Sequence, residues 1–331
     1  MSGGTLFEAF LNQHDGKAWA GVLQSLLPAI HEVDRNAVQI WFYFFPIDLA
    51  RALQQVEDKE QLEKKLLLRG KFYLKDQIDS SHEFLYGHRY WPAVKKAVEA
   101  HACSSKAPSS LDLAAQIREV AAKVASELKV EESLLIGITA VGFMTLQQVG
   151  IEAFKSAPGK INLDPKVARR TPQQVLAARA KDNGQGLFGF LRTVDKRWNI
   201  TFNENKPECV FKLINMQDLA MAAASDKRNY RLQDPRCIEG PIPVECRSAA
   251  CGTCWIGILG GAEKLSPMDA RERKKLAECG YIEAEGSHPL IRLACITAAS
   301  GAVSIVIPPW NGVFGKYLRS LKEREEQRQA V

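Results

Sequence analysis

The chain has 331 residues, of which 46% are hydrophobic and 25% are charged, and its formal net charge is +6. This composition is typical of a globular protein, and the length predicts about two domains. The basic residues are spread along the chain without a dominant tract, so we do not expect nucleic acid as a partner.

The beginning of the chain has no basic segment followed by an apolar core, so the sequence predicts no secretory signal. The most apolar stretch, residues 134–146, has 13 residues, whereas a membrane-spanning helix needs about 20. We therefore expect a buried helix there, with membrane contact as the alternative, and a cytoplasmic protein. In the cytoplasm cysteines stay reduced, and clusters of them more often bind metal than form disulfides.

Residues 1–195 are predicted to form a mostly helical domain, because apolar residues recur there at helical spacing. The clearest pattern covers residues 109–128, where Ser110 is placed to cap a helix. Another helix is expected after Thr171, with Pro172 at its first position. A glycine-rich segment then ends the pattern, and we place the domain boundary between residues 195 and 196.

Residues 196–331 show a pattern of short strands, with a charged helix or tail at the end. Strands are predicted at residues 198–203, 209–214, 255–261 and 302–308. The first two are expected to form a hairpin, followed by a helix at residues 216–225. Residues 266–279 predict a further helix, with Ser266 as its cap and Gly280 at its end.

Three of the eight cysteines lie within nine residues, at Cys246, Cys251 and Cys254. Thiolates are soft ligands, and four of them suit zinc or an iron–sulfur cluster. Zinc sites commonly use two CxxC pairs, whereas this uneven triplet is followed by one distant candidate, Cys295. A long loop with three ligands and a distant fourth is typical of a [2Fe–2S] cluster, with zinc as the alternative.

The motif C-R-x-x-A-C-x-x-C from Cys246 to Cys254, with an R-L-x-C that ends at Cys295, is similar to that of plant-type [2Fe–2S] ferredoxin domains. Residues of about 197–310 resemble this family, roughly a third of the chain. The resemblance implies a β-grasp fold, so we expect an α+β protein with a helical domain followed by a ferredoxin-like domain. It also implies that Cys246 and Cys251 bind one iron, and that Cys254 and Cys295 bind the other.

The chain differs from this family at three points. Ala249 stands where the family usually has glycine, so we expect a slightly different loop backbone. Cys254 and Cys295 are separated by 40 residues, a long connection that is similar to that of adrenodoxin-like members. Residues 197–331 contain 19 basic and 16 acidic residues, whereas plant ferredoxins are strongly acidic, so we do not expect the usual acidic docking face.

The remaining cysteines predict no further ligands. Cys209 and Cys279 fall in a predicted strand and at a predicted helix end, and both are expected to be small buried hydrophobic residues. Cys103 lies beside a predicted loop. Cys237 is only nine residues before Cys246, so it lies either near the cluster or, as we favour, in a structural position.

The N-terminal half carries aromatic and histidine residues without a recognisable site. The aromatic run at residues 41–45 is expected to be buried, with a partner-binding surface as the alternative. His82, His88 and His101 fit no ligand spacing, so we interpret them as solvent or core histidines rather than metal or haem ligands. We find no flavin, nicotinamide or nucleotide motif and no nucleophile–base pair, so no catalytic residue is proposed.

The sequence therefore predicts a one-electron transfer protein with a [2Fe–2S] cluster as its cofactor. We expect a dedicated subunit or partner of a larger redox enzyme or complex, with residues 1–195 as the docking domain. Such a partner can also be a membrane complex with which the protein associates peripherally. The alternative is a redox enzyme whose helical domain holds a substrate or metal site, using His82 and His88, which the cluster supplies with electrons. A third interpretation makes the cluster a sensor or a structural staple.

Overall fold

The structure is a computed structural model that describes residues 5–104, 112–182, 196–280 and 288–329. These residues form both helices and strands, so the predicted mixed α+β class is confirmed. The chain divides into two compact units, each with contributions from two stretches of sequence. Unit 1 comprises Met1–Gln55 and Tyr73–Pro172, and unit 2 comprises Val56–Phe72 and Gln173–Val331.

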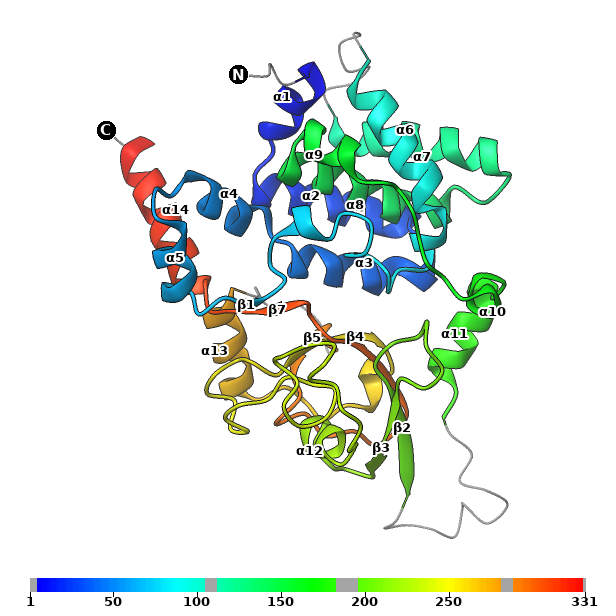
Figure 1. Cartoon of the computed structure of the whole chain (residues 1–331), viewed down its shortest axis with the longest axis vertical. Coiled ribbons are helices and arrows are strands. Elements are labelled where there is room, and N and C mark those ends of the chain that lie inside the picture. The colour runs from blue at the N-terminus through cyan, green and yellow to red at the C-terminus, as the bar shows by residue number, and fades with distance from the viewer. Residues whose placement is uncertain (1–4, 105–111, 183–195, 281–287, 330–331) are drawn as a thin grey trace. The chain divides into compact units, whose positions relative to one another are not determined.

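Unit 1 is helical. Its helices are α1 (Leu6–Asn12), α2 (Gly16–Leu26), α3 (Glu32–Phe44), α4 (Ile47–Gln55), α6 (Trp91–Ala102), α7 (Leu113–Leu128), α8 (Ser133–Val149), α9 (Ile151–Ser156) and α10 (Pro165–Ala168). Helix α8 is apolar on all sides, and it contacts α1, α2, α3, α4, α6, α7 and α9 (Figure 1). All of residues 134–146 are buried, which confirms the buried helix expected there.

The aromatic run of α3 also contributes to the core of unit 1. Trp41, Phe44 and Phe45 are buried, and the Trp41 ring packs against Phe45. The expected burial is therefore confirmed for these three residues. Within the described ranges, no helix combines the length and the apolar character that a membrane span requires.

Unit 2 contains a five-stranded sheet in the order β3-β2-β6-β4-β5. Its strands are β2 (Arg197–Thr201), β3 (Val210–Ile214), β4 (Trp255–Gly260), β5 (Ile291–Leu293) and β6 (Val303–Val306). Strands β2 and β3 form the predicted antiparallel hairpin, and β2 runs parallel to β6. Strand β4 is antiparallel to both β5 and β6. Every residue of β4 except the last and every residue of β6 is buried, so the middle of the sheet is covered on both faces.

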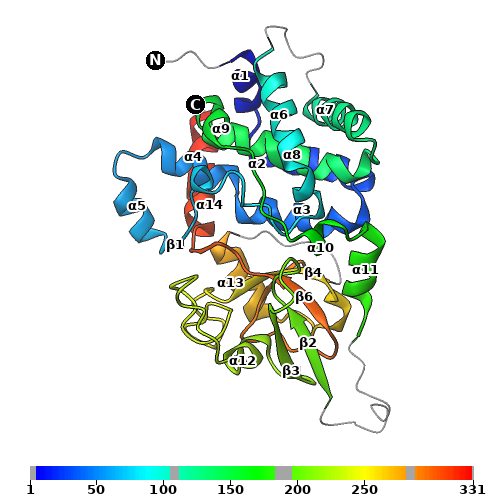
Figure 2. The same cartoon turned by 45° about the vertical axis from the view of Figure 1, so that its right-hand side comes forward.

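Unit 2 also contains helices and a second, two-stranded sheet. They are α5 (Lys59–Lys65), α11 (Pro172–Ala180), α12 (Leu219–Ala224), α13 (Ala270–Cys279), α14 (Gly315–Gln329), β1 (Arg69–Gly70) and β7 (Trp310–Asn311). Helix α12 packs beside β3 at the edge of the sheet (Figure 2). In the small sheet, β1 is antiparallel to β7, with Arg69 opposite Asn311.

The division into units differs from the expected boundary at residues 195 and 196. Residues 56–72 belong to unit 2 because β1 pairs with β7. Nearly all of α11 also belongs to it, and the Arg179 side chain forms an ion pair with Glu204 at 2.7 Å. The glycine-rich segment before residue 196 lies outside the described residues.

Two helix caps differ from those that the sequence favoured. Helix α7 begins after Asp112, whose carboxylate accepts a hydrogen bond from the Ala114 N–H, while Ser110 lies outside the described residues. Helix α13 is capped by Asp269 rather than Ser266. The reason is that Ser266 is held by Ala298, which accepts from the Ser266 N–H and donates to its hydroxyl. The helix therefore begins three residues later than a Ser266 cap requires, and it ends before Gly280 as predicted.

Candidate metal centre

Two neighbouring strand ends bring the distant cysteine to the cysteine loop. Cys254 directly precedes β4, and Cys295 lies two residues beyond β5. Because Trp255 on β4 is paired with Leu293 on β5, the two cysteines are held at the same end of the strand pair. The Ala294 N–H also donates to the Cys254 carbonyl at 2.9 Å.

The four predicted ligand residues lie together as two thiol pairs. The Cys254 and Cys295 side chains are joined by a hydrogen bond, and so are those of Cys246 and Cys251. The pairs are close enough to interact electrostatically, because Cys251 acts on Cys254 and Cys246 acts on Cys295. This pairing is the one that the ferredoxin resemblance assigns to the two irons.

Backbone N–H groups of the loop point at three of these sulfurs. The Ala249 N–H donates to Cys295 Sγ at 3.3 Å. Cys246 Sγ accepts from the N–H groups of residues 250 and 251, both at 3.3 Å. Cys251 Sγ accepts from residue 253 at 3.4 Å. Since N–H donors stabilise negative charge on sulfur, this loop is a cradle for thiolates.

The pKa values of the thiols reflect this environment. Partial burial opposes ionisation of Cys246, but hydrogen bonds from the Ser248 backbone and from Cys251 outweigh it and lower the pKa of Cys246 to about 6. The hydrogen bond with Cys295, followed by burial, raises the pKa of Cys254 well above its usual range. The same hydrogen bond lowers the pKa of Cys295, so within this pair one thiol stabilises the other as a thiolate.

The loop reaches this conformation through three left-handed residues. Arg247 and Ala249 have φ angles of 55° and 58°, and Gly252 has a φ of 77°. At Gly252 a side chain is also excluded by contact, because a Cβ there would lie 2.4 Å from Cys279 Sγ. At residue 249 the backbone has the conformation that glycine favours, although the residue is alanine. The alanine is therefore held in a strained conformation, and the expectation of a different loop backbone stays a prediction.

Side-chain hydrogen bonds connect the cysteine loop to β7 and to Arg236. The Asn311 side chain on β7 donates to the Thr253 carbonyl at 2.5 Å and accepts from Arg236 at 2.6 Å. Arg236 is itself held by Asp234 and by the Pro308 carbonyl. Asn311 was not identified from the sequence, since an asparagine beside a proline-rich turn carries no motif. Its role follows only from the pairing of β7 with β1.

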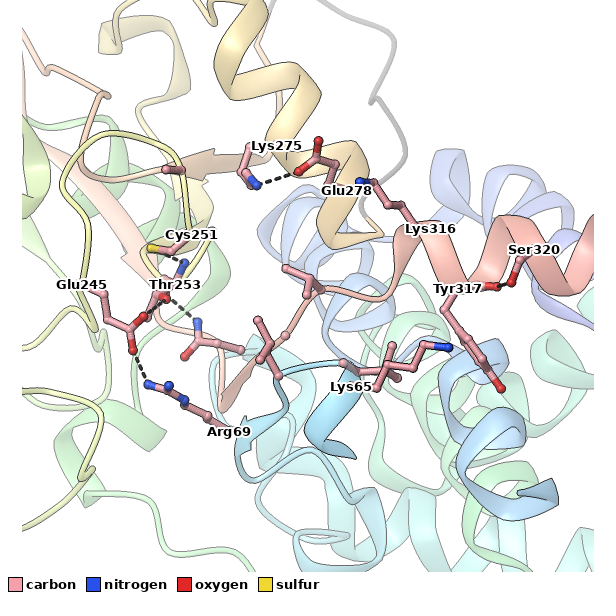
Figure 3. A pocket seen from close by; sticks show the side chains of 17 residues that line it. Lys65, Arg69, Glu245, Cys251, Thr253, Lys275, Glu278, Lys316, Tyr317 and Ser320 are labelled. Atoms are coloured by element: carbon pink, nitrogen blue, oxygen red, sulfur yellow. Dashed lines mark hydrogen bonds and ion pairs between the residues drawn. The ribbon is translucent and has the colours of Figure 1, made fainter. Parts of the chain in front are cut away.

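The two thiol pairs differ in exposure. Cys254 and Cys295 are 2% and 6% exposed, whereas Cys246 and Cys251 are partly exposed. Cys251 also lines a cleft of about 550 Å³ in unit 2 (Figure 3). One edge of the sulfur group therefore faces solvent, as expected for a loop site.

The other cysteines lie apart from the four-sulfur group or support it. Cys237 is buried and its thiol donates to the Pro241 carbonyl at 3.3 Å, in agreement with a structural position. Cys279 is fully buried as predicted and packs behind Gly252. Cys209 differs from its prediction, because it precedes β3 and is only partly buried. Cys103 is exposed at the end of α6.

In unit 1 the structure brings His82 and His88 together but not His101. The Nδ1 atoms of His82 and His88 are 2.9 Å apart, both side chains are buried, and the His82 ring packs against Trp91. His101 instead packs against the rings of Phe7 and Phe143. Among the residues that the structure describes, no three His, Cys, Asp or Glu side chains are grouped to hold a single metal ion.

The four sulfurs nevertheless fit a two-iron group. Each iron of a [2Fe–2S] cluster takes two protein ligands, and the loop supplies two thiol pairs. A zinc ion takes four ligands around one point. Soft donors, N–H groups aimed at sulfur and two lowered thiol pKa values are the chemistry that such a cluster requires.

No family model, curated protein or solved structure gave a significant match to this chain.

Proposed function

We propose that this protein carries a [2Fe–2S] cluster on Cys246, Cys251, Cys254 and Cys295 and transfers single electrons. The observation that carries the proposal is the pairing of the four thiols inside a loop whose N–H groups point at sulfur. When bound, such a cluster takes up and releases one electron at a potential of roughly −400 mV for the plant-type class. Four cysteine ligands leave no open position for a substrate, so the proposed role is that of a carrier.

The proposal includes a β-grasp fold for the main part of unit 2. Its support is the mixed sheet, in which the first strand of the hairpin, β2, lies parallel to the last strand, β6. Helix α12 follows the hairpin, and the cysteine loop precedes β4, in the order that the ferredoxin resemblance implies. The long connection before Cys295 contains α13.

We propose further that the protein serves one redox enzyme or complex rather than several partners. Unit 1 adds a second body to an electron carrier, and docking to a dedicated partner is the function that we assign to it. The cytoplasm is the proposed setting. All eight cysteines are free thiols in the structure, as expected in a reducing compartment, and four of them can bind iron.

The test is iron and sulfide analysis of anaerobically purified protein, with EPR spectroscopy after dithionite reduction. About two irons and two sulfides per chain, with a rhombic signal from one unpaired electron, are expected. Zinc without this signal would refute the proposal.

A redox enzyme is the second candidate, and the histidine pair of unit 1 favours it. His82 is fully buried, and its Nε2 atom has no hydrogen-bond partner among the described residues. In this case the helical unit holds a metal or substrate that receives electrons from the cluster. Metal in excess of the two cluster irons, lost in His82→Phe with the EPR signal retained, would support the enzyme over the simple carrier.

A further inference from the structure

The cleft beside the cysteine loop lies entirely within unit 2 and is built from four parts of it. They are the end of α5 with the segment after it, the cysteine loop, the end of α13, and the stretch from β7 into the start of α14 (Figure 3). The loop contributes Cys251, Gly252 and Thr253 to the lining. A molecule seated in the cleft therefore touches the loop at its partly exposed pair of cysteines.

The lining of the cleft carries an excess of positive charge. Four cations and two carboxylates line it: Lys65, Arg69, Lys275, Lys316, Glu245 and Glu278. Both carboxylates are already paired within the cleft, since Glu245 forms an ion pair with Arg69 and Glu278 forms one with Lys275. Glu245 also accepts a hydrogen bond from the Thr253 hydroxyl of the loop.

Two lysines of the lining, Lys65 and Lys316, form no ion pair among the described residues, although Lys316 is close enough to Glu278 to act on its carboxylate electrostatically. Lys65 and Lys316 are exposed, and Lys65 lies over the Tyr317 ring at 5.9 Å. Figure 3 shows Lys65, Lys316 and Tyr317 across the cleft from Cys251 and Thr253. Exposed charges of one sign around a concave surface attract partners of the opposite charge and accelerate their association.

An exposed apolar residue lies within this charged border. Leu67 is 58% exposed, and its backbone has a left-handed φ of 52°. This conformation is unfavourable for a residue with a side chain. Strained backbone that presents an apolar side chain to solvent is typical of a recognition site, where an apolar centre is surrounded by a polar rim.

We propose that this cleft is the docking surface for an acidic protein partner in electron transfer. The inference rests on the proposed function and adds the charge of the partner and the place where it binds. Carboxylates of the partner pair with Lys65 and Lys316, and an apolar group covers Leu67. The partner is then in contact with the loop at Cys251, so the electron crosses at the exposed edge of the sulfur group.

The test compares an acidic acceptor with a basic one. The dithionite-reduced protein is mixed in a stopped-flow instrument with flavodoxin, an acidic protein, or with cytochrome c, a basic protein. The rate constant for transfer to flavodoxin is expected to fall as salt screens the lysines. It is expected to fall more steeply than the rate constant for transfer to cytochrome c. In Lys65→Glu/Lys316→Glu, the rate with flavodoxin at low salt is expected to fall at least tenfold.

The matched control is Lys206→Glu/Lys227→Glu, which makes the same change in net charge at exposed lysines of unit 2 outside the cleft lining. This variant is expected to keep most of the rate with flavodoxin. Equal losses in both double variants would overturn the proposal, because net charge alone would then explain the effect. Transfer from the unmodified protein to cytochrome c that low salt accelerates more than it accelerates transfer to flavodoxin would also overturn it.

Failure of this inference can be distinguished from failure of the proposed function. The EPR signal of each variant is recorded first, and an intact signal with salt-independent transfer to flavodoxin refutes only the docking site. The absence of the signal from the unmodified protein refutes the carrier function and the docking site with it.

Discussion

Arg292 and Glu272 form a bidentate ion pair in the interior of unit 2, with side chains that are 3% and 1% exposed. Glu272 lies on α13, and its carboxylate also accepts from the Leu293 N–H at 2.7 Å. The pair therefore fastens α13 to the strand that leads to Cys295. In this way the long connection between Cys254 and Cys295 is anchored at the base of the sulfur group.

Replacing Glu272 is expected to destabilise unit 2. Glu272→Gln leaves the buried Arg292 guanidinium without its carboxylate, and the loss of one partner of a buried pair costs about 3–5 kcal/mol. Urea unfolding followed by tryptophan fluorescence measures this cost. Glu263→Gln, at an exposed position, is the control, with an expected change of less than about 0.5 kcal/mol. Equal midpoints for the two variants would contradict a structural role for the pair.

Replacing Cys254 is expected to abolish the normal cluster, whereas replacing Cys279 is not. Cys254→Ser removes one sulfur of the buried pair, so iron content and the EPR signal of the reduced protein are expected to fall together. Cys279 is not one of the four proposed ligands, and its buried sulfur packs against Gly252. Cys279→Ser is therefore expected to leave the cluster intact. A wild-type spectrum from Cys254→Ser, or loss of iron from Cys279→Ser, would mean that the ligands are wrongly assigned.

The left-handed backbone at residue 249 predicts opposite effects for two neighbouring substitutions. Ala249→Gly removes a strain of about 1–2 kcal/mol and adds about 0.4–1 kcal/mol of chain entropy in the unfolded state. The variant is therefore expected to be more stable by about 0.5–1 kcal/mol. Ala250→Gly gains nothing, because residue 250 is not left-handed, and it is expected to be less stable by about 0.4–1 kcal/mol.

Urea unfolding of the two glycine variants measures these changes, and the rate of iron loss to a chelator reports on the loop itself. Slower iron loss from Ala249→Gly than from Ala250→Gly is expected. The same shift in both variants would indicate that glycine acts through loop flexibility and that the φ of 58° carries no strain.

Local sequence patterns predicted much of the fold because they reflect local physics. Helical periodicity located the helices of unit 1, and alternation located the hairpin. The four cysteines that lie together were chosen from their spacing, since three of them share one loop. The cap of α13 was assigned wrongly because Ser266 is engaged by Ala298, which is 32 residues away.

Features that depend on distant pairing could not be predicted in this way. The strand β1 has only two residues, and its partner β7 is more than 200 positions later in the chain. Without that pairing, nothing in the sequence connects Lys65 or Arg69 with the cysteine loop. Glu272 was equally hidden, because a charged residue on a helix rich in charges is expected at the surface.

The buried histidine pair of unit 1 predicts acid sensitivity. Burial lowers the pKa of His88 to about 4; the nearby Asp79 opposes this shift, and Arg89 adds to it. Burial also lowers the pKa of His82. An unfolded histidine binds a proton near pH 6.5, but the folded pair does not. The stability is therefore complete above pH 6.5 and is lost as the pH falls towards 4, by about 3 kcal/mol for His88 alone.

Urea unfolding at several pH values between 7 and 4.5 measures this loss. The α-helical signal in far-UV circular dichroism follows the unfolding. In His88→Gln one titrating ring is absent, so the decline is expected to be shallower by up to about 1.4 kcal/mol for each pH unit. His288→Gln, at an exposed histidine, is expected to keep the original slope. The slope separates titration from simple destabilisation, which lowers stability equally at every pH. An unchanged slope in His88→Gln would show that burial does not lower the pKa of His88 below that of the unfolded chain.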